Sequence, residues 1–128
     1  MPDFQPLNLR NTPNYTQFED ASGLEYEVYG GESRLPVAFE IAANSVAVVK
    51  LAEGLIRSFI KFDGTYAANH CEVLAEPEDD GSLSLIRFSF ESASDPHEFG
   101  YTYYDVYVAL RDPPSPRFHP TKFVVGFW

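Results

Sequence analysis

Four segments with the alternation or apolar content of β-strands follow one another in the second half of the chain. Only short stretches separate them, and each stretch contains at least one proline. The predicted strands are His70–Ala75, Leu83–Phe90, Phe99–Leu110 and Thr121–Trp128. Strands joined by such short connections pair antiparallel, because a parallel pair needs a crossover of a dozen or more residues. The sequence therefore predicts an antiparallel sheet, and the fold must be built around it.

The first half of the chain contains one clear amphipathic helix. Ser45–Lys61 has apolar residues at spacings of three and four, and charged residues mark the opposite side. This spacing places Leu55 and Phe59 at the contact between the helix and the sheet. We expect them to meet Phe88 and Val108 there.

Two further strands are predicted before the helix. Leu24–Val28 alternates strictly between apolar and acidic residues, which is typical of a half-buried strand. Gly30-Gly31 follows, a dipeptide favoured in tight hairpin turns, and Leu35–Ile41 alternates again. We therefore predict a hairpin over residues 24–41. Residues 1–22 contain three prolines and three asparagines and are predicted to form an irregular N-terminal arm.

The predicted order of elements is β-β-α-β-β-β-β. A chain of 128 residues has the length of one domain. We predict a single α+β domain over residues 1–128, with its body in residues 24–128. One long amphipathic helix packs on one face of a curved antiparallel sheet, which gives an architecture of two layers.

The charge and the apolar pattern exclude two classes of partner. Nineteen acidic residues against nine lysines and arginines give a formal net charge of −10. A protein that binds the phosphate backbone needs lysine and arginine to displace counterions, so we expect no nucleic acid. The longest apolar stretch, residues 46–60, contains three charged residues and is too short to span a bilayer. We see no secretory signal and expect a cytoplasmic protein with no membrane partner.

No catalytic or metal-binding motif stands out. His70, Cys71 and Glu72 are consecutive, but neighbours in a strand point to opposite faces, so at most His70 and Glu72 share a side. A zinc site needs three or four convergent ligands, and His97 and Glu98 could join only through the tertiary fold. The chain has no nucleophile elbow and no phosphate-binding glycine loop. We therefore predict no catalytic residue, no metal and no cofactor, and the sequence favours a protein that is not an enzyme.

The long strand that ends at Leu110 has two different faces. One is apolar and is predicted to lie under the helix. The residues on the other face include Tyr101, Tyr103, Asp105 and Tyr107. Tyrosine is enriched at protein interfaces, so this face could bind a partner. The same tyrosines could instead pack against neighbouring strands, with the N-terminal arm covering them.

A turn rich in acidic residues follows the strand that ends at Ala75. Its acidic residues are Glu76, Glu78, Asp79 and Asp80. A calcium loop of the EF-hand type beginning at Glu76 would need glutamate at its twelfth position, where Arg87 stands. We therefore predict a solvated hairpin turn.

The clustered acids, the 16% aromatic content and the absence of catalytic motifs favour a non-catalytic binding protein. We predict an acidic protein that recognises or inhibits a basic protein, as immunity proteins and nuclease inhibitors do, because negative charge steers such encounters. The predicted partner-binding residues are Tyr101, Tyr103, Asp105, Tyr107, Glu76, Glu78, Asp79 and Asp80. One alternative is a small-molecule-binding protein or small enzyme with a pocket between helix and sheet. The other is a structural subunit that forms a homo-oligomer, such as a homodimer.

Overall fold

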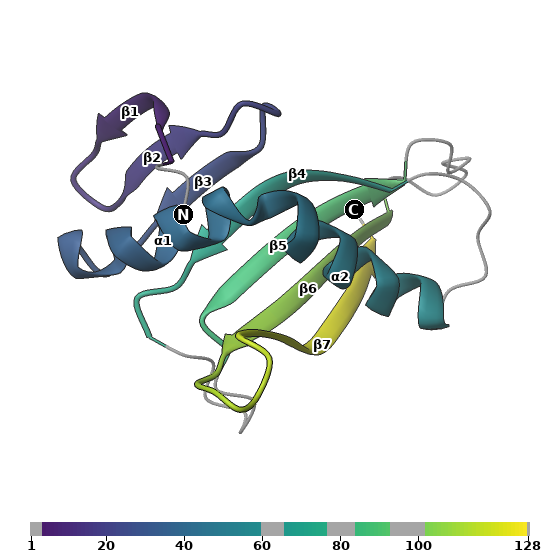
Figure 1. The fold of residues 1–128 in the computed structure, drawn as a ribbon. Helices are drawn as coiled ribbons and strands as arrows, with labels where there is room; N and C mark the ends of the chain where they lie inside the picture. The colour runs from purple at the N-terminus through teal and green to yellow at the C-terminus, as the bar shows by residue number, and fades with distance from the viewer. Residues whose placement is uncertain (1–3, 60–65, 77–83, 93–101, 128) are drawn as a thin grey trace.

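A seven-stranded sheet with two α-helices on one side forms the body of the protein (Figure 1). The computed structural model describes residues 4–59, 66–76, 84–92 and 102–127. The strands are β1 (Leu7–Asn11), β2 (Thr16–Glu19), β3 (Glu25–Val28), β4 (Tyr66–Val73), β5 (Ile86–Ser92), β6 (Thr102–Leu110) and β7 (Phe118–Phe127). The helices are the short 3-10 helix η1 (Glu32–Arg34), α1 (Leu35–Ala43) and α2 (Ser45–Phe59).

The strands lie in the sheet in the same order as in the chain. Neighbouring strands pair antiparallel throughout, except that β3 and β4 are parallel. A parallel pair needs a long crossover connection. Here the segment between β3 and β4 provides it and contains both α-helices. The predicted α+β class is therefore confirmed, with one parallel pair in a mostly antiparallel sheet.

Residues 35–41 form a helix, so the predicted hairpin over residues 24–41 is wrong. Pro36 lies in the first turn of α1, where its missing N–H would have had no partner in any case. The buried residues of α1 follow helical spacing and are Ala38, Ile41 and Ala42. Nearly every residue of this segment is apolar, so its apolar positions fit both the two-residue period of a strand and the 3.6-residue period of a helix. β3 pairs with β2 and β4 instead.

The N-terminal segment is more regular than the predicted irregular arm. β1 and β2 form a hairpin, and Pro13 and Asn14 lie in the turn between them. A backbone hydrogen bond of 2.8 Å closes this turn. The ring of Phe4 packs against Phe18 and Phe39, with centroid distances of 5.5 and 5.7 Å. Pro13 and Asn14 therefore form the turn of a hairpin that belongs to the sheet.

The core lies between the helices and the sheet. Phe88 and Val108 are fully buried, as predicted. The buried residues of α2 are Val48, Ala52 and Ile56. Leu55 is only partly buried, and Phe59 is 69% exposed, with its ring centroid 5.4 Å from that of Phe123. The prediction that Phe59 fills the helix–sheet contact is wrong. The apolar stripe of α2 is wide, and the part that faces the sheet is the one that contains Val48, Ala52 and Ile56.

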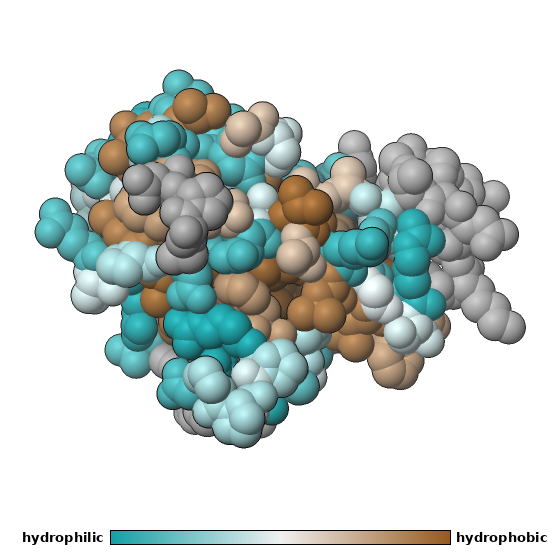
Figure 2. All heavy atoms as spheres, viewed as in Figure 1, coloured by the Kyte–Doolittle hydropathy of each residue, from teal (hydrophilic) through white to brown (hydrophobic). Residues whose placement is uncertain are grey.

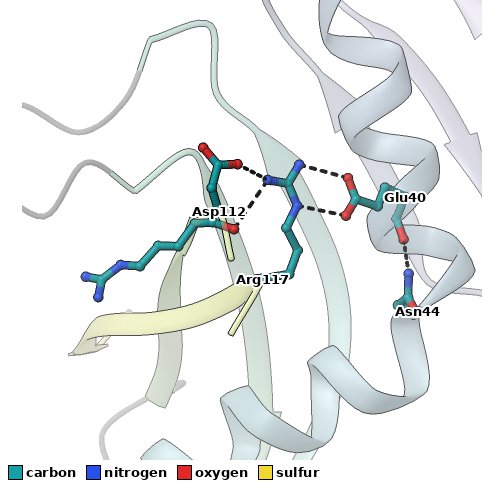
Figure 3. Close-up of polar contacts among 5 residues, drawn as sticks. Glu40, Asn44, Asp112 and Arg117 are labelled. Carbon is teal, nitrogen blue, oxygen red and sulfur yellow. Dashed lines mark hydrogen bonds and ion pairs between the residues drawn. The ribbon is translucent and has the colours of Figure 1, made fainter. Parts of the chain in front are cut away.

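An ion pair connects α1 to the segment that leads into β7 (Figure 3). Nε and Nη2 of Arg117 lie 2.9 and 3.0 Å from the carboxylate oxygens of Glu40, and Nη1 lies 3.6 Å from Asp112. Asn44, at the bend between the helices, donates a 2.8 Å hydrogen bond to the Glu40 carbonyl. The Arg117 side chain is 41% exposed, and pairs so open to water contribute at most about 1 kcal/mol. The pair therefore orients α1 more than it stabilises the fold.

The helix side of the molecule has exposed apolar surface along α2 (Figure 2). Val46, Leu51 and Phe59 are exposed there. A hollow of about 590 Å³ follows the helix, and its lining includes Gly54 and Pro120.

No single helix in the described ranges is long and apolar enough to cross a membrane. The segments Glu32–Ala43 and Ser45–Phe59 satisfy length and composition only when taken together, and they meet at a bend of 81°.

Candidate functional site: the open face of the sheet

Charged side chains gather on the side of the sheet that points away from α1 and α2. We call this side the open face, because no helix of the described chain lies on it (Figure 1). Its polar and aromatic residues on β3 to β6 are Glu25, Glu27, His70, Glu72, Arg87, Ser89, Glu91, Tyr103, Asp105 and Tyr107. The residues that alternate with them point into the core, as Tyr26, Cys71 and Phe88 do. The central strands thus present five carboxylates together with one arginine and one histidine.

A row of directly paired residues crosses the open face. The register places Glu27 beside Glu72, Glu72 beside Arg87, Arg87 beside Tyr107, and Tyr107 beside Lys122. Nη2 of Arg87 forms an ion pair with Glu72. Nζ of Lys122 lies 4.4 Å from the centroid of the Tyr107 ring, which is a cation–π contact. Cations therefore occupy the β5 to β7 side of the row, whereas two glutamates stand side by side on β3 and β4.

His70 lies between these two glutamates. Its Nε2 is 3.6 Å from Oε1 of Glu27 and 3.6 Å from Oε1 of Glu72. Hydrogen bonding to Glu72 and the charge of Glu27 raise the pKa of His70, although partial burial opposes this. The contact with His70, assisted by Arg87, lowers the pKa of Glu72. We call Glu27, His70 and Glu72 the Glu–His cluster.

A tyrosine supports the cluster from the end of β3. The hydroxyl of Tyr29 donates a 2.7 Å hydrogen bond to Oε1 of Glu27. Burial, together with this bond, raises the pKa of Tyr29 to about 12. The phenol therefore stays protonated at neutral pH and holds the Glu27 carboxylate in place.

Cys71 points away from the cluster and into the core. It is fully buried, and burial raises the pKa of its thiol. The prediction that only His70 and Glu72 of these consecutive residues share a face is confirmed. The third member, Glu27, comes from β3 through the parallel pairing with β4. His97 and Glu98, which were considered as further ligands, lie outside the described residues.

The predicted tyrosine face is largely engaged in packing within the sheet. The Tyr103 ring lies across Gly126 of β7, so close that a methyl group on Gly126 would be 2.1 Å from the ring Cζ. Tyr107 is only 8% exposed and lies beside Lys122. Tyr101 lies outside the described residues. The N-terminal hairpin does not cover this region, because β1 and β2 lie at the opposite edge of the sheet from β7.

We expect Gly126→Ala to destabilise the protein by about 1–3 kcal/mol, because the new methyl group must displace the Tyr103 ring. Denaturant unfolding measures this loss. In a Tyr103→Ala background the obstacle is gone, and Gly126→Ala should cost much less. The double-mutant cycle isolates the contact, and equal costs in the two backgrounds would show that the ring does not lie across Gly126.

The structure places two of the predicted acidic partner-binding residues. Asp105 is half-buried on the open face, opposite Ser89 of β5 and Val124 of β7. Glu76 is exposed and follows the end of β4. His70 of β4 lies in the same row as Asp105, and Glu76 comes six positions later in the chain. The structure does not bring Glu76 into that row. Glu78, Asp79 and Asp80 lie outside the described residues.

The predicted site residues do not include Glu25, Glu27, Arg87 or Glu91. A signal was present for Glu25, Glu27 and Arg87, because each alternates with a buried residue in a predicted strand and therefore points outward. Glu91 directly follows the predicted strand that ends at Phe90. Outward position alone does not show which of these residues come together, because that depends on the order of the strands in the sheet.

The described residues form a packed core between the helices and the sheet. Large side chains of the sheet, among them Tyr26, Phe88 and Phe90, form one buried cluster with Ile41 of α1 and Ile56 of α2. The hollows lined by described residues include one along α2, one beside β1 and β2, and one of about 560 Å³ between α2 and β4, whose lining includes Val49, Glu53 and Ala68. The core is therefore packed, and the hollow between α2 and β4 leaves the alternative of a pocket between helix and sheet as a prediction.

The open face is thus an array of half-buried and exposed carboxylates on paired strands, with one imidazole and one guanidinium among them. No family model matches the chain, and neither a curated protein nor a solved structure matches it significantly.

Proposed function

We propose that this is a non-catalytic binding protein that recognises a basic protein through the open face. One observation carries the proposal: the open face has five carboxylates against one arginine on the central strands. Arg87 already pairs with Glu72, so its positive charge does not pair with the other four carboxylates. The net charge of −10 adds a long-range attraction for a basic partner.

The spacing of the acidic residues suits lysine and arginine side chains of a partner. Glu25, His70, Ser89 and Asp105 form one row across β3 to β6. Adjacent strands are about 4.8 Å apart, so the two carboxylates at the ends of this row are separated by roughly 14 Å. Cationic side chains can approach the carboxylates while their stems pack on the half-exposed Tyr103 ring. Occupation of a basic functional surface in this way would make the protein an inhibitor or immunity protein.

The proposal can be tested with three matched forms of the protein. The first is the wild type. The second removes three open-face charges, and its substitutions are Glu25→Gln, Glu91→Gln and Asp105→Asn. The third removes three charges elsewhere, and its substitutions are Glu32→Gln, Glu53→Gln and Asp112→Asn. Each form is immobilised, exposed to an extract of the native source and eluted with salt, and the bound proteins are identified by mass spectrometry.

We expect the wild type and the third form to retain the same basic protein. The open-face variant should bind it at least about tenfold more weakly, which corresponds to roughly 1.4 kcal/mol. With the purified pair, the association rate should fall as salt rises, since exposed charges are screened over about 10 Å at 0.1 M. Equal binding by both variants, a partner that is not basic, or an association rate independent of salt would each reject the proposal.

A further inference from the structure

We propose that the Glu–His cluster binds one zinc ion, a function that goes beyond partner recognition and does not depend on it. Zinc takes imidazole nitrogen and carboxylate oxygen as ligands, with bonds of about 2.0–2.2 Å. The cluster offers one ligand atom from each of Glu27, His70 and Glu72, and these atoms all lie within 4.8 Å of one another. Catalytic zinc sites commonly have three protein ligands and keep a fourth position for water or another group.

The distances in the cluster approach those of a tetrahedral site. Bonds of this length imply ligand atoms about 3.3 Å apart at tetrahedral angles. Nε2 of His70 lies 3.6 Å from an oxygen of Glu27 and 3.6 Å from an oxygen of Glu72. The exposed fractions of these side chains are 22%, 22% and 17%, so water and ions can reach them. The two distances from Nε2 exceed the tetrahedral spacing by about 0.3 Å, and no two of the three ligand atoms are more than 4.8 Å apart.

Two adjacent strands of the sheet, β3 and β4, provide the backbone that carries the cluster. The parallel ladder pairs Glu27 with Glu72 and Glu25 with His70 on adjacent strands. Ligands on strands are positioned more accurately than ligands on loops. β3 and β4 are both interior strands of the sheet, so each is held by a neighbour on either side.

Each carboxylate also has a hydrogen-bond donor that orients it. Tyr29 donates to Glu27, and Arg87 pairs with Glu72. Such outer contacts are a regular feature of metal sites and hold the ligands in place. The Glu72 oxygen that faces His70, Oε1, is also the one that pairs with Arg87. A carboxylate has two oxygens with about four acceptor positions, so Glu72 can bind a metal and still accept from Arg87.

The donor set distinguishes zinc from the common hard cations. Calcium takes six to eight oxygen ligands, and magnesium prefers octahedral oxygen and retains its water. One imidazole with two carboxylates suits zinc better than either. The neighbouring arginine also reduces the negative charge that would hold a purely electrostatic cation.

The test uses the full chain, stripped of metal with a chelator and titrated with zinc chloride in a calorimeter. We expect one zinc ion per chain. His70→Ala should weaken binding by at least about tenfold, and Glu27→Gln should weaken it measurably. His119→Ala, which removes a histidine of β7, and Glu91→Gln, which removes another open-face carboxylate, are the matched controls and should bind as the wild type does. Cobalt absorption reports the coordination geometry, and zinc should shift the His70 imidazole signals in NMR spectra.

Circular dichroism melting of each variant shows whether it remains folded, and Glu27→Gln keeps the test valid if His70→Ala does not fold. The proposal fails if the wild type binds no stoichiometric zinc, if His119→Ala weakens binding as much as the cluster variants do, or if magnesium or calcium binds as tightly. The experiment uses the isolated protein, and of the three charge substitutions on the open face it includes only Glu91→Gln, as a control that should leave zinc binding unchanged. Its failure is therefore distinct from a failure of the proposed partner recognition.

Discussion

Ile56→Ala is expected to lower the free energy of unfolding by about 2–5 kcal/mol, because it removes a fully buried side chain and leaves a cavity. Ile56 lies on α2, in the buried cluster that joins the helices to the sheet. Denaturant unfolding monitored by circular dichroism measures the loss. A change in the midpoint without a change in slope would show that stability alone is affected.

Phe59→Ala is the matched control on the same helix. Phe59 is larger than Ile56 but 69% exposed, so its truncation should cost less than about 1 kcal/mol despite the contact with Phe123. The two variants together measure which side of α2 faces the sheet. A larger loss for Phe59→Ala than for Ile56→Ala would mean that the helix is rotated from the described orientation.

Asp20→Ala is expected to cost about 3 kcal/mol or more. The Asp20 side chain is almost fully buried and organises the turn between β2 and β3. Its carboxylate accepts hydrogen bonds from the backbone N–H of Ser22 at 2.9 Å and of Leu24 at 3.2 Å. It also accepts from the hydroxyls of Ser22 and Tyr26. Its removal leaves several donors without this acceptor, and each buried donor left unsatisfied costs about 1–3 kcal/mol.

Two neighbouring substitutions provide the comparison for Asp20. Asp20→Asn keeps one acceptor oxygen in the same place, so it should lose less stability than Asp20→Ala. Glu19→Ala changes the adjacent acid, which is not fully buried, and should have an effect within about 1 kcal/mol. If Asp20→Ala and Glu19→Ala cost the same, the hydrogen bonds to Asp20 do not hold the turn.

The elements that could be predicted are those whose pattern has only one interpretation. β3 alternates between apolar and acidic residues, and α2 combines helical spacing with a charged side. By contrast, residues 35–43 are apolar at almost every position, and such a segment fits a strand and a helix equally well. The hairpin of β1 and β2 was missed because its strands are only five and four residues long and lie next to turn-forming residues.

The candidate site shows a second limit of sequence reasoning. Alternation correctly indicates that His70 and Glu72 share a face, because that relation is local. Glu27 joins them across 43 positions of the chain, and only the parallel pairing of β3 with β4 brings it there. The tyrosines of β6 show the same limit, because their exposure depends on Gly126 and Lys122 of the neighbouring strand.

The identical order of the strands in the chain and in the sheet has a consequence for folding. Each strand pairs with the strand immediately before or after it, so most backbone pairings close short loops. Contacts that are local in sequence accompany fast folding. Only the pairing of β3 with β4 must close a long loop, and its entropic cost grows with the logarithm of the loop length. For folding kinetics, the protein consists of two meanders whose strands pair locally, β1–β3 and β4–β7. The long segment with α1 and α2 connects them, and the pairing of β3 with β4 joins the two meanders into one sheet.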